Sequence, residues 1–446
     1  MARRLVSVDR ETPLLMPPAI QEWVAEDDMA RFVVDAVCLV DEGCGRINWR
    51  GSGSEQYPPH MMMALLIYCY ANGLFSSRRI ERATYRDVAV RFITGDTHPD
   101  HDTIATFRRE NGGLFKACFT KVLAMAREMK VRRVGEIAID GSKLEANASA
   151  KRILTKERME GEIHDLEQQV ARLLEQAAQA DQADGQSADG SSLPEELRHS
   201  RNRLDAMRAA MKRLEQKTSA RSSRRSEERD KFDREGPGEP PRALCEKPRP
   251  TDTVHPCDPD ARLMPMKKGG HAPGYNVQLA VQADPKAPLI LATGVCEDTS
   301  DRRQLQPMVD KALEAQPDTT HVHVDTGYDN SAQIHQVETR HGVVVYCPPE
   351  RAARRNNESR QSAARKTTIA FREGMKACMR SPRGKTSQRL RATTVEPVFA
   401  WIKHTLGFKR FQLRGLAKAG IEWELMCLSH NMQLLHRHSL LSRTSG

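Results

Sequence analysis

Apolar side chains in the first part of the chain recur three or four positions apart, which is the spacing of one face of an amphipathic helix. Ile20 and Phe32 belong to the first such series, and a longer one predicts a single helix over about 102–129. The run 61–70 is continuously apolar, but it has about half of the length that a bilayer requires. We therefore predict a helical N-terminal domain over residues 1–130 and no membrane span.

The pattern then changes to short runs of apolar and β-branched residues that turn signals separate. The first run predicts a buried strand that ends in Asp140, and a last helical region is predicted to open near Glu396. Between them the pattern predicts strands at 275–282, 289–295, 321–325 and 343–347, and helices near 301–315 and 331–340. Three strands, helix, strand, helix, strand, helix is the order of an α/β ribonuclease H-like domain with a mixed sheet.

A segment with coiled-coil character interrupts this domain. Apolar residues at heptad spacing run from 163 to 177 and again from 197 to 214, on either side of a linker rich in Ala, Asp, Gly and Ser. The proline-containing stretch 219–265 that follows is predicted to be flexible. We predict a helical hairpin with a flexible linker, inserted over residues 151–265. The α/β domain then comprises residues 131–150 and 266–436. The sequence leaves open whether the insert is a spacer, a dimerisation element or a DNA clamp.

The charge of the chain is unevenly distributed. The total is +10, yet the segment 351–415 alone holds seventeen Lys and Arg against three acidic residues, which is a net charge of +14. Such a concentration favours an acidic partner, nucleic acid above all, over an ordinary solvated face. Candidate DNA contacts are Lys403, Arg391, Lys409, Arg410 and Arg414, and in the N-terminal helices, which are compatible with a helix-turn-helix, Arg78, Arg79 and Arg108.

The ten cysteines are scattered without a CxxC pair, and the first residues do not resemble a signal peptide. This pattern favours a reducing compartment. We expect a cytoplasmic, nucleoid-associated protein.

Asp140, Asp325 and Glu396 are the candidate catalytic residues. Two-metal cleavage of a phosphodiester needs oxygen ligands around a pair of hard cations roughly 3.5–4 Å apart, and two aspartates with a glutamate suit that need. Gly141 and Gly327 lie close behind the two aspartates and leave room for a DNA backbone. The pattern therefore predicts a centre that binds two Mg²⁺ or Mn²⁺ ions.

Other interpretations of these acids stay open. Each aspartate also suits an ordinary turn, and Glu396 suits a helix-capping box that starts at Thr393. Pro397 counts against that box and favours a helix that begins at Thr394. His321, His323 and Asp325 alternate as zinc ligands do on a strand, and a second possible zinc set is Cys245, His255 and Cys257.

Several segments resemble bacterial insertion-sequence transposases of the DDE type. LFSSRRIE at 74–81 and DHDTIATFRR at 100–109 are similar to their helical N-terminal domain. Four further motifs are similar to their catalytic domain: IDGSKLEANAS at 139–149, GYNVQ at 274–278, VDTGY at 324–328 and TVEPVF at 394–399. Together with LGFKRF at 406–411, the resemblance spans nearly the whole chain apart from the insert.

The resemblance implies that Asp140, Asp325 and Glu396 bind the two metal ions and that Lys403 belongs to the helical signature after the glutamate. It implies cleavage at the ends of an element and joining to target DNA. It also implies a homodimer or higher oligomer on double-stranded DNA that carries terminal inverted repeats. In many relatives a Tyr and an Arg precede the glutamate, but here Arg389 and Ala392 occupy those positions. The alternatives are a nuclease of the same fold and a catalytically decayed, transposase-derived DNA-binding protein.

Overall fold

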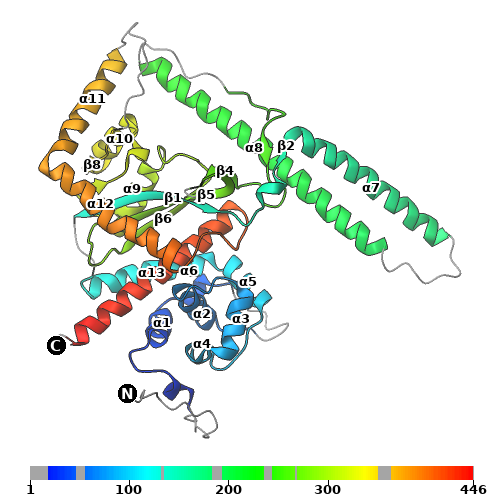
Figure 1. Cartoon of the computed structure of the whole chain (residues 1–446), viewed down its shortest axis with the longest axis horizontal. Helices are drawn as coiled ribbons and strands as arrows, with labels where there is room; N and C mark the ends of the chain where they lie inside the picture. Colours follow the sequence, from blue (N-terminus) through cyan, green and yellow to red (C-terminus); the bar gives the residue numbers. More distant parts are fainter. Residues whose placement is uncertain are drawn as a thin grey trace, which may run out of the picture. The chain divides into compact units, whose positions relative to one another are not determined.

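The computed structural model describes residues 19–46, 56–131, 135–182, 193–235, 244–266, 269–349 and 363–444 (Figure 1). The chain divides into two compact units, Met1–Val122 with Leu428–Gly446 and Leu123–Cys427. All ten cysteines are unpaired. No helix within the described ranges is both long and apolar enough to cross a membrane.

The first unit is helical, as predicted. Its helices are α1 (Met29–Cys38), α2 (Pro59–Ala71), α3 (Ser77–Arg86), α4 (Val88–Thr94), α5 (His101–Glu110), most of α6 (Gly112–Glu128) and the later part of α13 (Leu416–Thr444), with short 3₁₀ turns at Ile20–Trp23 and Glu42–Cys44. The apolar run 61–70 lies in α2, which is buried on almost every side and therefore forms the interior of this unit.

The single helix that we predicted over 102–129 is wrong. The chain forms α5 and α6 instead, with Asn111 as the break between them. The Asn111 side chain donates from Nδ2 to the carbonyl of Phe107 and accepts the backbone N–H of Arg46. These two bonds cap the end of α5 and tie it to a distant loop, which apolar periodicity alone does not reveal.

The second unit contains a mixed sheet. Its strands are β1 (Glu136–Glu145), β4 (Arg262–Pro265), β5 (His271–Gln282), β6 (Ile290–Cys296), β7 (His321–His323) and β8 (Val344–Tyr346). They lie in the order β4-β5-β1-β7-β8, and β6 also pairs with β5. β5 is antiparallel to β1, β4 and β6, whereas β7 and β8 are parallel to β1.

Helices alternate with the later strands of this sheet, as predicted. They are α9 (Leu305–Ala315), α10 (Ser331–His341), α11 (Ala363–Arg380) and α12 (Pro382–Ala400). A five-residue π-helical turn, Trp401–Thr405, follows α12 and leads towards α13. The chain is thus a multidomain protein with a helical N-terminal part and an α/β part.

Two predicted boundaries near the candidate acids are wrong. Asp140 lies in the middle of β1 and not at its end, because β1 stays paired with β5 as far as Glu145 after its pairing with β7 has stopped. The last helix does not open near Glu396: α12 begins after Ser381, whose hydroxyl caps it. Thr394 lies inside α12 and donates to the carbonyl of Leu390, so it is no N-cap.

The insert consists of two long helices, α7 (Lys156–Gln182) and α8 (Leu193–Glu235). They lie side by side and run in opposite directions (Figure 1). Met159, Leu166, Leu204 and Met207 belong to the apolar cluster between them. The predicted flexible stretch 219–265 is wrong in two places, because α8 continues to Glu235 and the later residues form β4 and the small strand β3 (Thr253–Val254), which pairs with β2 (Leu154–Thr155). Residues 183–192 and 236–243 lie outside the described ranges.

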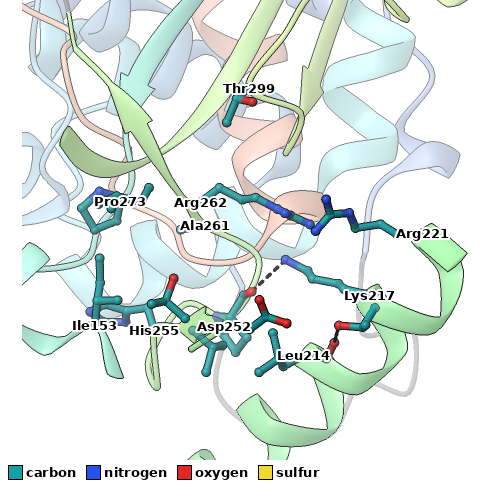
Figure 2. A pocket seen from close by; sticks show the side chains of 15 residues that line it. Ile153, Leu214, Lys217, Arg221, Asp252, His255, Ala261, Arg262, Pro273 and Thr299 are labelled. Atoms are coloured by element: carbon teal, nitrogen blue, oxygen red, sulfur yellow. Dashed lines mark hydrogen bonds between the residues drawn. The ribbon is translucent and has the colours of Figure 1, made fainter. Parts of the chain in front are cut away.

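Ion pairs fix α8 to the sheet. Lys217 is only 8% exposed, pairs with Glu297 at 2.5 Å and donates to the carbonyl of Pro259 at 2.8 Å. Arg213 pairs with Asp260 at 2.6 Å, and Arg262 lies 3.8 Å from Glu297. We call Arg213, Lys217, Arg262, Asp260 and Glu297 the insert root. Figure 2 shows a pocket of about 240 Å³ beside it, with Lys217, Arg221 and Arg262 in its wall.

Candidate active site

Strand pairing places the two candidate aspartates next to each other. β1 and β7 are parallel with Glu136 opposite His321 and Ala138 opposite His323, and the same register continued sets Asp140 beside Asp325. Asp325 lies two residues after the end of β7 and accepts the backbone N–H of Gly327 at 2.5 Å. Asp140 accepts the N–H of Gly141 at 2.8 Å and is 16% exposed. Both carboxylates therefore lie where β1 and β7 separate.

Arg391 links the third acid to this pair. From α12 its guanidinium donates to Asp140 Oδ2 at 3.0 Å and to Glu396 Oε1 at 2.8 Å. Arg391, next to the position 392 where the resemblance leads one to expect an arginine, thus faces the acids, while Ala392 is exposed. We call Asp140, Asp325 and Glu396 the carboxylate centre.

Two sets of contacts hold α12 against the sheet on either side of Arg391 and Glu396. On one side His323 lies between Ser387 of α12, 2.7 Å from Nδ1, and Glu136 of β1, 2.8 Å from Nε2. On the other side Lys403, in the π-helical turn, donates to the Ser142 hydroxyl and, at 2.9 Å, to the carbonyl of Lys143. A residue between these two attachments has little freedom to shift along β1.

The histidine contacts argue against the zinc interpretations. Both ring nitrogens of His323 are engaged, and burial lowers its pKa against the opposing effect of Glu136. His321 bonds Thr320 and stacks on Tyr346. In the second set, His255 Nδ1 accepts the backbone N–H groups of residues 257 and 258. His323 is thus engaged at both ring nitrogens, and His321 and His255 are each engaged at Nδ1.

The carboxylate centre carries excess negative charge. Burial raises the pKa of Asp140 to about 6, and the charges of Asp325 and Asp301 act in the same direction, against the opposing effect of Arg391. Burial and the same three aspartates also raise the pKa of the Tyr328 hydroxyl. Carboxylates close enough to disfavour each other's ionisation are the usual setting for a bound cation.

The residues of the centre fit a divalent metal ion in chemistry and charge. They offer oxygen atoms only, as Mg²⁺ and Mn²⁺ prefer. Within the described part of the chain, no three His, Cys, Asp or Glu side chains are gathered as the ligands of one ion. At this centre Arg391 occupies one oxygen each of Asp140 and Glu396.

The candidate DNA contacts of the C-terminal part have different surroundings. Lys409, Arg410 and Arg414 are exposed, and Arg410 pairs with Glu145 at 2.5 Å. Arg410, Arg414 and Arg152 line a hollow of about 460 Å³ at the far end of β1 from Glu136. Lys403, in contrast, donates to Ser142 and Lys143 of β1. The basic residues at 351–362 lie outside the described ranges.

The candidate contacts of the N-terminal unit also separate into two kinds. Arg78 and Arg79 are exposed on α3, as are Arg82 and Arg86. Arg108 is 3% exposed, and its guanidinium donates to the Tyr70 hydroxyl and, at 2.6 Å, to the carbonyl of Phe75. The guanidinium of Arg108 is thus engaged inside this unit, whereas Arg78 and Arg79 are on its surface.

Two family models match the chain. The Transposase DDE domain matches residues 325–436, which include Asp325, Arg391 and Glu396. The Transposase domain (DUF772) matches residues 19–110, the helical unit before α6. The chain belongs to the DDE transposases of insertion sequences. No curated protein and no solved structure matches it.

The match to the DDE domain begins at Asp325, so Asp140 lies outside it. In the structure Asp140 shares Arg391 with Glu396, and the β1–β7 register, continued by two residues, sets it beside Asp325. Membership of these families indicates a role in DNA transposition.

Proposed function

We propose that this transposase cuts DNA at the ends of an insertion sequence and joins the freed 3′ ends to target DNA, with Asp140, Asp325 and Glu396 as the metal-binding acids. The observation that carries the proposal is the position of these side chains. They come from β1, from the end of β7 and from α12, and pairing of β1 with β7 and the Arg391 bridge bring them together.

The sheet supports a ribonuclease H-like fold for residues 131–150 and 266–436. In chain order its main strands are β1, β5, β6, β7 and β8, and in space they run β6-β5-β1-β7-β8 with β5 antiparallel to β1. The first acid lies on the central strand and the second follows the parallel strand next to it. We regard residues 151–265 as an insert in this domain and residues 1–130 as the DNA-binding domain.

A pair of Mg²⁺ or Mn²⁺ ions would supply activation of the attacking oxygen and stabilisation of the leaving oxygen. Asp140, Asp325 and Glu396 would hold them. For Glu396 and Asp140 to do so, Arg391 must give up at least one of its two carboxylate bonds, and its freed nitrogen would then be available to a DNA phosphate. His323 and Lys403 keep the helix and the strand in place while this happens.

The surface cations provide a path for double-stranded DNA. Arg410 and Arg414 border the hollow at the end of β1, Lys409 lies beside them, and the exposed arginines of α3 offer a second contact surface on the helical unit. We propose that terminal inverted repeats and target DNA bind to these surfaces of a homodimer or higher oligomer associated with the nucleoid.

The test is a cleavage and joining assay with the full chain and a labelled duplex that ends in the terminal repeat of the element. Mg²⁺ and Mn²⁺ should support nicking and strand transfer, and Ca²⁺ should support binding with negligible cleavage. Cleavage without joining would identify a nuclease. Binding without either reaction in any of these ions would identify a decayed, DNA-binding relative.

A further inference from the structure

A fourth acidic side chain lies against the carboxylate centre. Asp301 belongs to the turn before α9, and its carboxylate reaches the two glycines that follow the catalytic aspartates. A Cβ added at Gly141 would lie 2.5 Å from Asp301 Oδ1, and one added at Gly327 would lie 3.3 Å from Oδ2. A side chain at position 141 would therefore displace this carboxylate. The glycine there is needed for Asp301 to approach β1.

Two buried amides hold one oxygen of this carboxylate. Asn276 donates to Oδ1 at 2.6 Å and Gln278 donates to the same atom at 2.7 Å. Both amides alternate on β5, so they point to the same face of the sheet, and they are 0% and 1% exposed. Gln278 is fixed in turn, because its carbonyl oxygen accepts the hydroxyl of buried Tyr328.

Oδ2, the second oxygen of the Asp301 carboxylate, has a different environment from Oδ1. Lys143 approaches Oδ1 at 3.5 Å, so all hydrogen bonds and ion pairs that the described residues make with this carboxylate go to the same atom as the amide bonds. Oδ2 is on the side of Gly327, next to Asp325. One oxygen held by two amides and a lysine and the other on the side of Asp325 is the arrangement of a metal-ligating carboxylate with its supporting hydrogen bonds.

We propose that Asp301 is a further cation-binding residue of the active centre, oriented by Asn276 and Gln278. This inference rests on the proposed function, since it assigns a residue to the same metal site. The electrostatics of the neighbours agree with it: after burial and Asp325, the charge of Asp301 is a further cause that raises the pKa of Asp140.

The experiment measures Mn²⁺ affinity of the full chain by titration calorimetry without DNA, so that no catalysis is involved. Asp301→Asn keeps the shape of the side chain, and we expect it to weaken Mn²⁺ binding about tenfold or more. Asn276→Ala, which removes one orienting amide, should weaken it by about tenfold, the lower end of the range for supporting residues. Asp301→Glu, which keeps the charge, should bind Mn²⁺ more tightly than Asp301→Asn.

Asp298→Asn is the matched control. Asp298 lies in the same turn, and its carboxylate bonds Gln304 at 3.3 Å, so the variant loses the same charge nearby without touching either glycine. Its Mn²⁺ affinity should stay within about twofold of the parent, because Asp298 bonds Gln304 and does not border either glycine. An equal loss in Asp298→Asn and Asp301→Asn would reduce the effect to general electrostatics and overturn the assignment.

The remaining outcomes separate the inference from the proposed function. If Asp325→Asn weakens Mn²⁺ binding and Asp301→Asn lowers only the melting temperature, Asp301 is structural and the proposed function stands. If the parent protein binds no Mn²⁺ and cleaves no DNA, the proposed function itself fails.

Discussion

Asp140 in the carboxylate centre and Asp260 in the insert root are aspartates of similar exposure, 16% and 19%, and each bonds an arginine, at 3.0 and 2.6 Å. Their pKa values nevertheless shift in opposite directions. Burial raises the pKa of Asp140 to about 6. Burial acts in the same direction on Asp260, but the backbone N–H of Leu416 and the bond from Arg213 outweigh it and lower its pKa.

The difference lies in the neighbours. In the insert root three cations pair with two acids, so the charges of the buried acids are compensated within the protein. In the carboxylate centre Arg391 pairs with two of the three acids, Asp140 and Glu396, and the charges of Asp325 and Asp301 act on Asp140 from close by. The root is a structural attachment that is complete as it stands. We propose that the centre is completed by divalent cations.

The largest expected effect is on catalysis. Asp140→Asn, Asp325→Asn and Glu396→Gln should each reduce strand cleavage by about 10³-fold or more while DNA binding stays within a few-fold, because metal ligands act as a unit. A gel assay of nicking with Mg²⁺ measures this. Asp310→Asn, at the surface pair of Asp310 with His341, is the control and should cleave normally. A residue whose variant keeps more than about a tenth of the parent rate does not belong to the centre.

The insert root should respond in stability. Lys217→Met leaves Glu297 buried without its closest cation and should lower the free energy of unfolding by about 3–5 kcal/mol, as for other broken buried pairs. Denaturant titration measures this change in the free energy of unfolding. Lys212→Met, on the exposed side of α8, should change little. The double variant Lys217→Met/Glu297→Gln should recover part of the loss. Equal stability of both single variants would show that the root does not attach the insert.

The opposite pKa shifts predict opposite effects of neutral isosteres. The folded state holds the proton of Asp140 more tightly than the unfolded chain does, so ionisation costs stability as pH rises from about 4 to about 6. In EDTA at pH 8, Asp140→Asn should therefore raise the free energy of unfolding, by at most about 3 kcal/mol. The parent should become less stable between about pH 4 and 6, and the Asp140→Asn variant should not show this decline.

Asp260→Asn should behave in the reverse way. Its depressed pKa contributes stability that is present above the unfolded value near 3.8 and is lost as pH falls through the folded value. The variant should be less stable than the parent at pH 8 and approach it in acid. If both aspartate variants shift stability in the same direction at pH 8, the contrast between centre and root is wrong.

The smallest expected effect concerns non-specific DNA affinity. Each cation on a phosphate contributes about 0.9 to the slope of log affinity against log salt. Replacing Arg78, Arg79, Arg82 and Arg86 by Ala should flatten that slope by up to about 3.6 if α3 lies on DNA. A second quadruple variant, at Arg351, Arg354, Arg355 and Arg360, tests the basic segment in the same titration. A slope that changes in neither variant would exclude both surfaces.

The sequence predicted those features of the fold that local patterns determine. Short apolar runs with polar ends located the strands and placed Asp140 and Asp325 beside a sheet, and the parallel pairing of β1 with β7 then brings them together. The helix start predicted at Thr394 was wrong, because a threonine inside a helix can also donate to a carbonyl one turn earlier, as Thr394 does to that of Leu390. Ser381 before Pro382, a standard helix start, was the better signal.

Contacts between distant positions were not predictable in this way. His323 joins Glu136 and Ser387, which lie far from it along the chain, and neither partner forms a recognisable motif with it. Asp301 was interpreted as the first residue of a helix, and only the fold shows that it meets Gly141. Arg391 differs by one position from the expected arginine, and the orientation of α12 decides which of the two residues faces Asp140.

The central claim is that the carboxylate centre, and not the insert root, is the place where this transposase takes up divalent cations. Anomalous diffraction from crystals of the full chain soaked in Mn²⁺ tests it directly. We predict an anomalous peak in contact with Asp140 and Asp325, with Arg391 turned away from at least one of its two carboxylates. A peak at Asp260 and Glu297, or Mn²⁺-saturated crystals in which Arg391 still bridges Asp140 and Glu396 and no peak is seen, would contradict the account.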